Sequence, residues 1–252
     1  MFSVDLNSDL GESYGAFKVG CDEDILKYIS SANIACGWHG GDPVVIEKTV
    51  KLAKKNNVAV GAHPSYPDLL GFGRRRMILS SDELKAYTKY QLGAFWAFAK
   101  CSDLDVTHIK PHGAMYNDAA SDYSIARAIA EATFEINPSI AFMALANSQM
   151  VKAANDVGLR VISEVFADRA YEDDGSLMAR SKEGSVIHDT DICIQRIMKM
   201  LREGTVFSAS GKIISVNPDS ICVHGDNPSA LLFVQKIAEN LRLEGIGIAP
   251  CK

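Results

Sequence analysis

The chain has 252 residues, of which 47% are hydrophobic and 23% are charged, and its net charge is -5 with a pI near 5.7. This length allows one large core, and the acidic balance argues against a nucleic-acid partner, because phosphate binding needs a basic stripe. No apolar run approaches the ~20 residues needed to cross a membrane. The first five residues show no secretion signal, so a cytoplasmic location is predicted.

The six cysteines are irregularly spaced, and none forms a Cys-x-x-Cys pair. Neither a zinc knuckle nor a disulfide framework is therefore indicated. Free thiols in a reducing compartment are expected.

Short apolar, β-branched runs recur along the chain, and most of the intervals between them have helical length. The predicted strands are Ser3–Leu6, Ala32–Ala35, Val58–Gly61, Val106–Ile109, Ala141–Ala144, Val161–Val165 and Ile221–Val223. The predicted helices are Pro43–Asn56, Ser81–Lys100, Ser121–Ile136, Ser148–Asp156, Thr190–Leu201 and a last helix from Asn227-Pro228 to about Leu243. Strands that alternate with helices pair in parallel through right-handed crossovers. Seven units favour a TIM-like (β/α) barrel, although an open doubly wound sheet would show the same alternation.

One stretch departs from this alternation. Val206–Val216 contains two β-prone runs around Ser210-Gly211, which predicts a small hairpin. The chain is accordingly expected to form one barrel domain over residues 1–252, with a hairpin insertion near 205–217.

The first predicted strand runs into a polar phrase. Asp5, Asn7 and Asp9 alternate along it and therefore share one face, and Glu12 follows. Three polar groups inside a barrel are costly to bury unless they bind a ligand or one another. Catalysis is one interpretation, and a hydrogen-bonded network that fixes the N-terminal strand is the other.

Histidines follow four of the predicted strands directly. They are His39, His63, His112 and His224. Imidazole at a strand end can act as a general acid, a general base or a metal ligand. The carboxyl ends of parallel strands share one reaction centre in barrel enzymes, so these histidines are expected to gather there.

Cations and a thiol also follow strands. Lys110 could hold an anion, or it could form an interior ion pair with Asp5, Asp9 or Glu164. Asp168-Arg169 and Arg180 bracket a loop that could act as a lid with an arginine grip. Cys36 is interpreted as a small buried thiol, because nothing near it in sequence would activate it.

Nucleotide-binding motifs are missing from the sequence. The nearest approach to a P-loop is Gly211-Lys212, but Ile213 follows where Ser or Thr is required, and no G-x-G-x-x-G fingerprint occurs. If the protein uses ATP, a standard Walker site in this chain does not hold it.

Six long phrases occur in one order along nearly the whole chain. They are DLNSDLGE at Asp5–Glu12, ANIACGWHGGDP at Ala32–Pro43, GAHPSYPDLLGFGRR at Gly61–Arg75, IKPHGAMYN at Ile109–Asn117, EVFADRAY at Glu164–Tyr171 and CVHGDNP at Cys222–Pro228. Together they resemble the LamB/YcsF family. Ser8 stands where the family pattern has cysteine, which speaks against a catalytic thiol there.

The resemblance implies a seven-stranded (β/α) barrel of the glycoside hydrolase/deacetylase type. It also implies opening of the 5-oxoproline lactam to L-glutamate, coupled to hydrolysis of ATP (as Mg-ATP), by a complex in which this chain is the A component and works with the B and C subunits of 5-oxoprolinase. The candidate catalytic residues are Asp5, Asn7, Asp9, Glu12, His39, His63, Lys110 and His112. The candidate substrate-binding residues are Asp42, Glu164, Asp168, Arg169, Arg180, His224 and Asp226.

Within this hypothesis Asp9 or Asp5 orients water or substrate, and His39, His63 or His112 handles protons. Lys110 with Arg169 or Arg180 would then hold the substrate carboxylate or a phosphorylated oxygen.

Two other functions fit the same residues. Asp9, His39, Asp42 and His63 have the ligand types of a divalent metal site, which would suit a metal-dependent amide hydrolase or deacetylase. The chain could instead be a substrate-binding subunit that carries out no catalysis itself. The least favoured interpretation is a barrel whose polar ends are purely structural.

Overall fold

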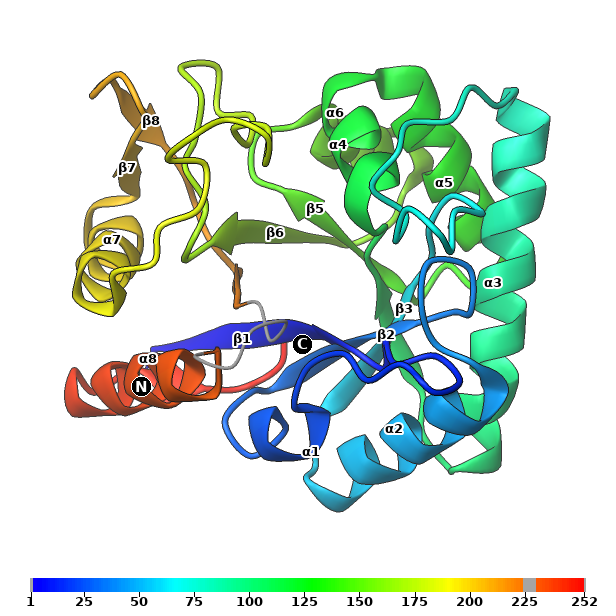
Figure 1. Cartoon of the computed structure of the whole chain (residues 1–252). Coiled ribbons are helices and arrows are strands. Elements are labelled where there is room, and N and C mark those ends of the chain that lie inside the picture. The colour runs from blue at the N-terminus through cyan, green and yellow to red at the C-terminus, as the bar shows by residue number, and fades with distance from the viewer. Residues whose placement is uncertain (1, 224–229, 252) are drawn as a thin grey trace.

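The computed structural model describes residues 2–223 and 230–251. Seven parallel strands form a closed barrel, which Figure 1 shows with helices around it. In barrel order they are β1 (Ser3–Leu10), β2 (Ser31–Ala35), β3 (Ala59–His63), β4 (Val106–Ile109), β5 (Ala141–Leu145), β6 (Val161–Phe166) and β9 (Ser220–Cys222). Strand β9 pairs with both β6 and β1, and this double pairing closes the ring. The predicted closed barrel is confirmed, and the open sheet is excluded.

Strand β1 is the longest of the barrel strands and extends beyond the predicted run. Asn7 to Leu10 pair with β2, while Asp5 to Asn7 pair with β9. A short strand, β10 (Gly247–Ile248), pairs in parallel with the start of β1 and was not predicted. The polar phrase of β1 is thus held between neighbouring strands, and its side chains alternate between the barrel interior and the outer layer.

Side chains cap the starts of most of the helices that surround the barrel. They are α1 (Asp22–Ile25), α2 (Pro43–Lys55), α3 (Ser81–Cys101), α4 (Gly113–Ser121), α5 (Tyr123–Ile136), α6 (Gln149–Val157), α7 (Thr190–Glu203) and α8 (Ala230–Leu243). Ser80 and Glu83 form a capping box at α3, and Asp42 accepts hydrogen bonds from two amides of α2. The predicted start of the last helix at Asn227-Pro228 lies outside the described residues.

The predicted helix Ser121–Ile136 corresponds to α5, and a separate helix, α4, precedes it. Asp122 caps α5 and ends α4, so the regular helix begins at Tyr123. Helix α4 was not predicted because it begins at Gly113, whose φ of +57° is unfavourable for other residues. A Cβ at Gly113 would lie 2.6 Å from the carbonyl oxygen of Gly73, and the amide of Ala114 donates to that same oxygen. This start of α4 therefore depends on a tertiary contact.

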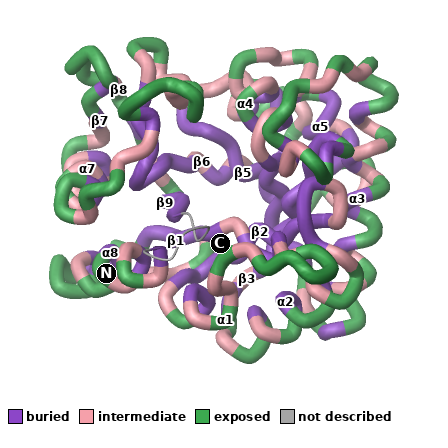
Figure 2. Tube along the Cα trace, viewed as in Figure 1, coloured by how far each residue is buried: buried purple, intermediate pink, exposed green. Residues whose placement is uncertain are grey.

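Strands β7 (Thr205–Phe207) and β8 (Ile213–Ser215) pair in antiparallel fashion outside the barrel, within the segment predicted as a hairpin. Figure 2 shows that the buried residues concentrate on the central strands, while exposed residues lie on the outer helices and loops. Across residues 2–223 and 230–251, no helix is both long and apolar enough to cross a bilayer.

Candidate functional site

The amino-terminal end of the barrel interior holds a saturated polar group, here called the floor network: Asp5, Ser30, Ser31 and Ser220. The Asp5 carboxylate accepts hydrogen bonds from Ser30 at 2.6 Å, from Ser31 at 2.7 Å and from Ser220. Asp5 is only 1% exposed, and burial raises the pKa of its carboxyl above the ordinary value. Asp5 thus belongs to a hydrogen-bonded network, the sequence-based alternative to a catalytic role for this strand.

A second layer joins the strands above the floor. The Asn7 amide donates to Glu164 at 3.0 Å and to Ser220 at 2.7 Å. Asn33 donates to Asn7, and a ring nitrogen of His108 lies 2.7 Å from Asn33 Oδ1. Burial is the main reason that the pKa of His108 is lowered to about 3, and the positive charge of Lys110 is the second. His108 is therefore neutral at neutral pH.

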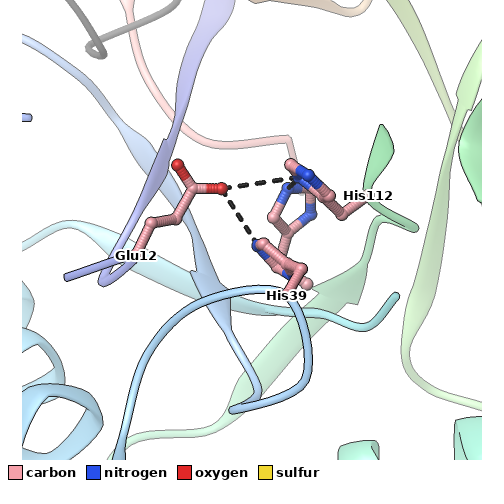
Figure 3. A group of neighbouring side chains, drawn as sticks. Glu12, His39 and His112 are labelled. Atoms are coloured by element: carbon pink, nitrogen blue, oxygen red, sulfur yellow. Dashed lines mark hydrogen bonds and ion pairs between the residues drawn. The ribbon is translucent and has the colours of Figure 1, made fainter. Parts of the chain in front are cut away.

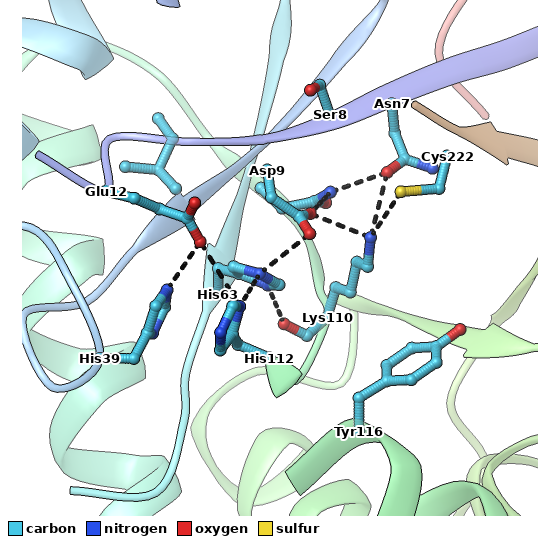
Figure 4. Close-up of polar contacts among 12 residues, drawn as sticks. Asn7, Ser8, Asp9, Glu12, His39, His63, Lys110, His112, Tyr116 and Cys222 are labelled. Atoms are coloured by element: carbon cyan, nitrogen blue, oxygen red, sulfur yellow. Dashed lines mark hydrogen bonds and ion pairs between the residues drawn. The ribbon is translucent and has the colours of Figure 1, made fainter. Parts of the chain in front are cut away.

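Lys110 stands at the centre of the interior, as Figure 4 shows. Its ammonium lies 2.8 Å from Glu164 Oε1, 2.9 Å from Asp9 Oδ1 and 3.2 Å from Cys222 Sγ. Burial alone would lower the pKa of Lys110, but Asp9, Cys222 and Glu164 outweigh it and hold the pKa well above its usual range. The interior ion pair considered from the sequence is present with Asp9 and Glu164.

Four buried residues meet at the carboxyl ends of the strands, and they are here called the mouth cluster: Glu12, His39, His63 and His112. Glu12 Oε1 lies 3.0 Å from His39 Nε2 and 3.4 Å from His112 Nδ1, as Figure 3 shows. His63 Nε2 lies 3.0 Å from His112 Nδ1, and the rings of His39 and His112 stack with centroids 3.7 Å apart. Burial first, and neighbouring histidines second, lower the pKa of His39 and of His112 well below the usual value.

A cavity of about 350 Å³ opens onto these groups. Its lining combines acids and histidines with cations, namely Asp9, Glu12, His63, His112, Arg74, Lys110, Arg169 and Arg180. Arg169 is buried and donates to the carbonyl oxygens of Ser185 and Met178, and burial lowers its pKa to about 10. The cavity therefore presents both carboxylates and positive charge to a small polar ligand.

Other predicted residues lie away from this cavity. Asp42 caps α2 and accepts from the amide of Gly15, and Glu164 lies beneath the cavity with Tyr116 and Lys110 as partners. Asp168 is buried at the end of β6, and its carbonyl oxygen accepts from Ile187. The candidates His224 and Asp226 lie outside the described residues.

The cysteines are all free. Cys36 is buried, as interpreted from the sequence, and burial raises its pKa to about 12.

Several interior residues were not predicted. Asn33 and His108 lie within strands, and Tyr116 donates to Glu164 from α4 at 2.6 Å. A signal existed for His108, because it lies two residues before Lys110 on the same strand face. Asn33 is likewise the only polar residue of the predicted strand Ala32–Ala35.

The mouth cluster has the composition of a metal site. Glu12, His39, His63 and His112 each offer one ligand atom, and these atoms lie within 4.8 Å of one another. The set predicted from the sequence shares His39 and His63 with this cluster. Asp42 is not a member, because its carboxylate is engaged at the start of α2.

A closed (β/α) barrel with acids, histidines and cations around a cavity at its strand ends has the architecture of barrel enzymes. The LamB/YcsF family model matches residues 4–252, and the chain belongs to the LamB/YcsF family.

Named relatives share nearly the whole chain. The A subunit of 5-oxoprolinase from Alkaliphilus metalliredigens is 54% identical over 248 residues, which cover 98% of this chain and 97% of that protein. The crystal structure of a lactam utilization protein from Thermus thermophilus is 44% identical, with a TM-score of 0.93, and the match covers 98% of this chain and 99% of that one.

More distant structures share the fold alone. The catalytic domain of a peptidoglycan N-acetylglucosamine deacetylase from Eubacterium rectale is 12% identical with a TM-score of 0.52, over 99% of this chain and 88% of that one. The predicted deacetylase-type barrel is thus confirmed as a fold.

Proposed function

We propose that this chain is the A component of a 5-oxoprolinase and that it opens the 5-oxoproline ring to L-glutamate with hydrolysis of ATP. The names of its relatives support a lactam substrate, and they describe one component of a larger assembly. The observation that carries the proposal is the cavity in which Asp9 and Lys110 face Arg169 and Arg180. It offers a proton acceptor next to cations that suit an anionic substrate.

Coupling to ATP has a chemical reason. A five-membered lactam is an unstrained and weakly electrophilic amide. Transfer of the γ-phosphoryl group of ATP to the lactam oxygen releases ADP and makes the ring carbon attackable by water. Water addition, with protonation of the ring nitrogen, breaks the C–N bond and leaves an acyl phosphate. A second water hydrolyses this acyl phosphate to L-glutamate and inorganic phosphate.

We assign the attacking water to Asp9. Its carboxylate reaches the cavity, with 14% of the side chain exposed, and Lys110 and Asn33 hold it at 2.9 Å and 2.8 Å. A fixed carboxylate next to a cavity can orient water and accept its proton. The ion pair with Lys110 fixes the position of this carboxylate at the cavity wall.

We assign the substrate carboxylate, and then the phosphorylated oxygen, to Arg169 and Arg180. Both guanidinium groups line the cavity, and arginine suits carboxylate and phosphate because its fork of donors matches two oxygens at once. His63 and His112 lie beside the two acids, since His63 Nε2 is 3.4 Å from Asp9 and His112 Nδ1 is 3.4 Å from Glu12.

We assign the binding of Mg-ATP to the complex with the B and C subunits rather than to this chain by itself. The sequence contains neither a P-loop nor a dinucleotide fingerprint, so no standard Walker site in this chain holds ATP. A nucleotide site that a partner supplies or completes fits this observation.

The direct test measures glutamate released from 5-oxoproline by the chain alone, by the B and C partners alone and by all three together, each with and without ATP. Release that needs both ATP and the partners is the expected result. No release by a complex that demonstrably assembles would overturn the substrate, and the metal-dependent hydrolase would then become the leading hypothesis. Release by the partners without this chain would leave it with a non-catalytic role.

A further inference from the structure

In the mouth cluster, His63 and His112 face each other through nitrogens that cannot form a hydrogen bond when both rings are neutral. His63 Nδ1 lies 2.7 Å from the carbonyl oxygen of Lys110, and His112 Nε2 lies 2.9 Å from the carbonyl oxygen of Phe72. A carbonyl oxygen only accepts, so each of these nitrogens carries its ring's proton. In neutral rings, His63 Nε2 and His112 Nδ1 are then both acceptors, although they lie 3.0 Å apart.

Carboxylate oxygens approach the same point. Glu12 Oε1 lies 3.4 Å from His112 Nδ1, and Asp9 Oδ2 lies 3.4 Å from His63 Nε2. Lone pairs thus converge from two rings and two acids in a buried place, which costs free energy unless a positive charge lies between them.

We propose that Glu12 Oε1, His63 Nε2 and His112 Nδ1 bind one first-row divalent metal ion of the zinc type. Ligand atoms about 2.0–2.2 Å from zinc at tetrahedral angles lie roughly 3.3 Å apart, and the contacts of 3.0 and 3.4 Å agree with this spacing. Two imidazoles with one carboxylate favour zinc and its neighbours over magnesium, which prefers oxygen ligands.

The surroundings of these three ligands support the assignment. A histidine that binds metal usually donates its other N–H to a carbonyl or carboxylate, and both His63 and His112 donate to carbonyl oxygens. The ligating carboxylate is itself held, since His39 Nε2 lies 3.0 Å from Glu12 Oε1 and the His39 ring stacks on His112. We assign His39 the role of positioning Glu12, because its Nε2 contacts the same carboxylate oxygen.

The fourth position would open onto the cavity. Glu12, His63 and His112 line the cavity, and Asp9 lies beside His63 on its wall. A metal with three protein ligands and one open position is the arrangement of a catalytic site rather than a closed structural one. The ion would place a Lewis acid next to the group that we assign to the attacking water.

The test uses the full chain purified without chelators or metal-affinity resin and then stripped and desalted. Titration calorimetry with Zn²⁺ alone should show one site per chain, with a dissociation constant below about 1 μM. Thermal unfolding should shift to higher temperature with Zn²⁺ and not with equal Mg²⁺, because a ligand that binds only the folded state stabilises it.

Variants separate the cluster from adventitious binding. Glu12→Gln and His112→Asn should each weaken zinc binding at least ~100-fold, and His39→Gln should weaken it about 10–100-fold through the lost support. His188→Gln is the matched control, because this histidine is exposed in the loop before α7, and it should bind zinc like the unaltered chain.

Circular dichroism establishes that each variant is folded before titration. The proposal is overturned if the folded, unaltered chain binds no zinc below about 10 μM, in which case a shared proton occupies the point between the rings. Unchanged zinc affinity in folded Glu12→Gln and His112→Asn would also overturn it. Neither readout uses lactam turnover, so the metal site and the proposed function fail or succeed separately.

Discussion

Asp5 and Asp9 are the same residue type, four positions apart on one face of β1, yet the structure gives them different surroundings. Asp5 is enclosed by three serine hydroxyls and is only 1% exposed. Asp9 is held by Lys110 and Asn33, and its carboxylate still reaches the cavity with 14% of the side chain exposed. The comparison teaches that a saturated carboxylate serves the fold, whereas one with an open side can meet a substrate.

The first test has the largest expected effect, because it removes Lys110, the cation that pairs with both Asp9 and Glu164. Lys110→Met leaves the buried Glu164 and the partly exposed Asp9 without their ion-pair partner, so it should lower the free energy of unfolding by roughly 3–5 kcal/mol and abolish turnover. Urea unfolding and glutamate release by the assembled complex measure the two effects. Lys54→Met, which breaks the exposed pair with Asp103, should cost no more than about 1 kcal/mol.

The second test isolates the cavity-facing carboxylate. Asp9→Asn keeps the shape of the side chain but removes its basicity, so turnover should fall at least about 100-fold. Lys110 keeps Glu164 as an ion-pair partner, so the free energy of unfolding should fall by less than in Lys110→Met. Steady-state kinetics of the complex and urea unfolding of the chain provide the readouts. Turnover equal to that of the unaltered protein would remove Asp9 from the mechanism.

The third test makes the same substitution in the floor network. Asp5→Asn weakens hydrogen bonds to a charged acceptor, so it should lower the free energy of unfolding by about 1–2 kcal/mol and leave turnover within about twofold. Both variants are assayed side by side. A large loss of turnover in Asp5→Asn at unchanged stability would restore Asp5 as a catalytic candidate.

The last test concerns Asp22, which lines the cavity and accepts from the amide of Gly11 at 2.8 Å. Burial raises its pKa from 3.8 to about 6. Because the folded-state pKa is raised, folding favours the protonated acid, and stability should be lost as pH rises from about 4 to 6. Asp22→Asn should remove up to roughly 2 kcal/mol of this pH dependence.

Urea unfolding at several pH values between about 4 and 7 measures this difference. Asp24→Asn is the matched control, since it removes the same charge from the same helix at a half-exposed position. Identical pH profiles for Asp22→Asn and the unaltered chain would contradict the expectation.

The sequence determined much of the architecture because helix and strand periods are local properties. All seven barrel strands and most helices could be read from neighbouring residues. Helix α4 could not, because its start depends on the contact between Gly113 and Gly73, which lie far apart in sequence.

The sequence also determined which residue types gather at the strand ends, and its long phrases were specific enough to indicate the family by themselves. Only the tertiary structure decided which of those residues belong to the floor network, which to the mouth cluster and which to neither. In the structure, Asp5 is bonded to serines and Asp42 lies at the start of α2, apart from the histidines. Glu12 lies beside His39 and His112. The physical reason is that strand periodicity tells which side chains face inward, whereas barrel closure and register set their height and partners, and these arise from pairings between distant parts of the chain.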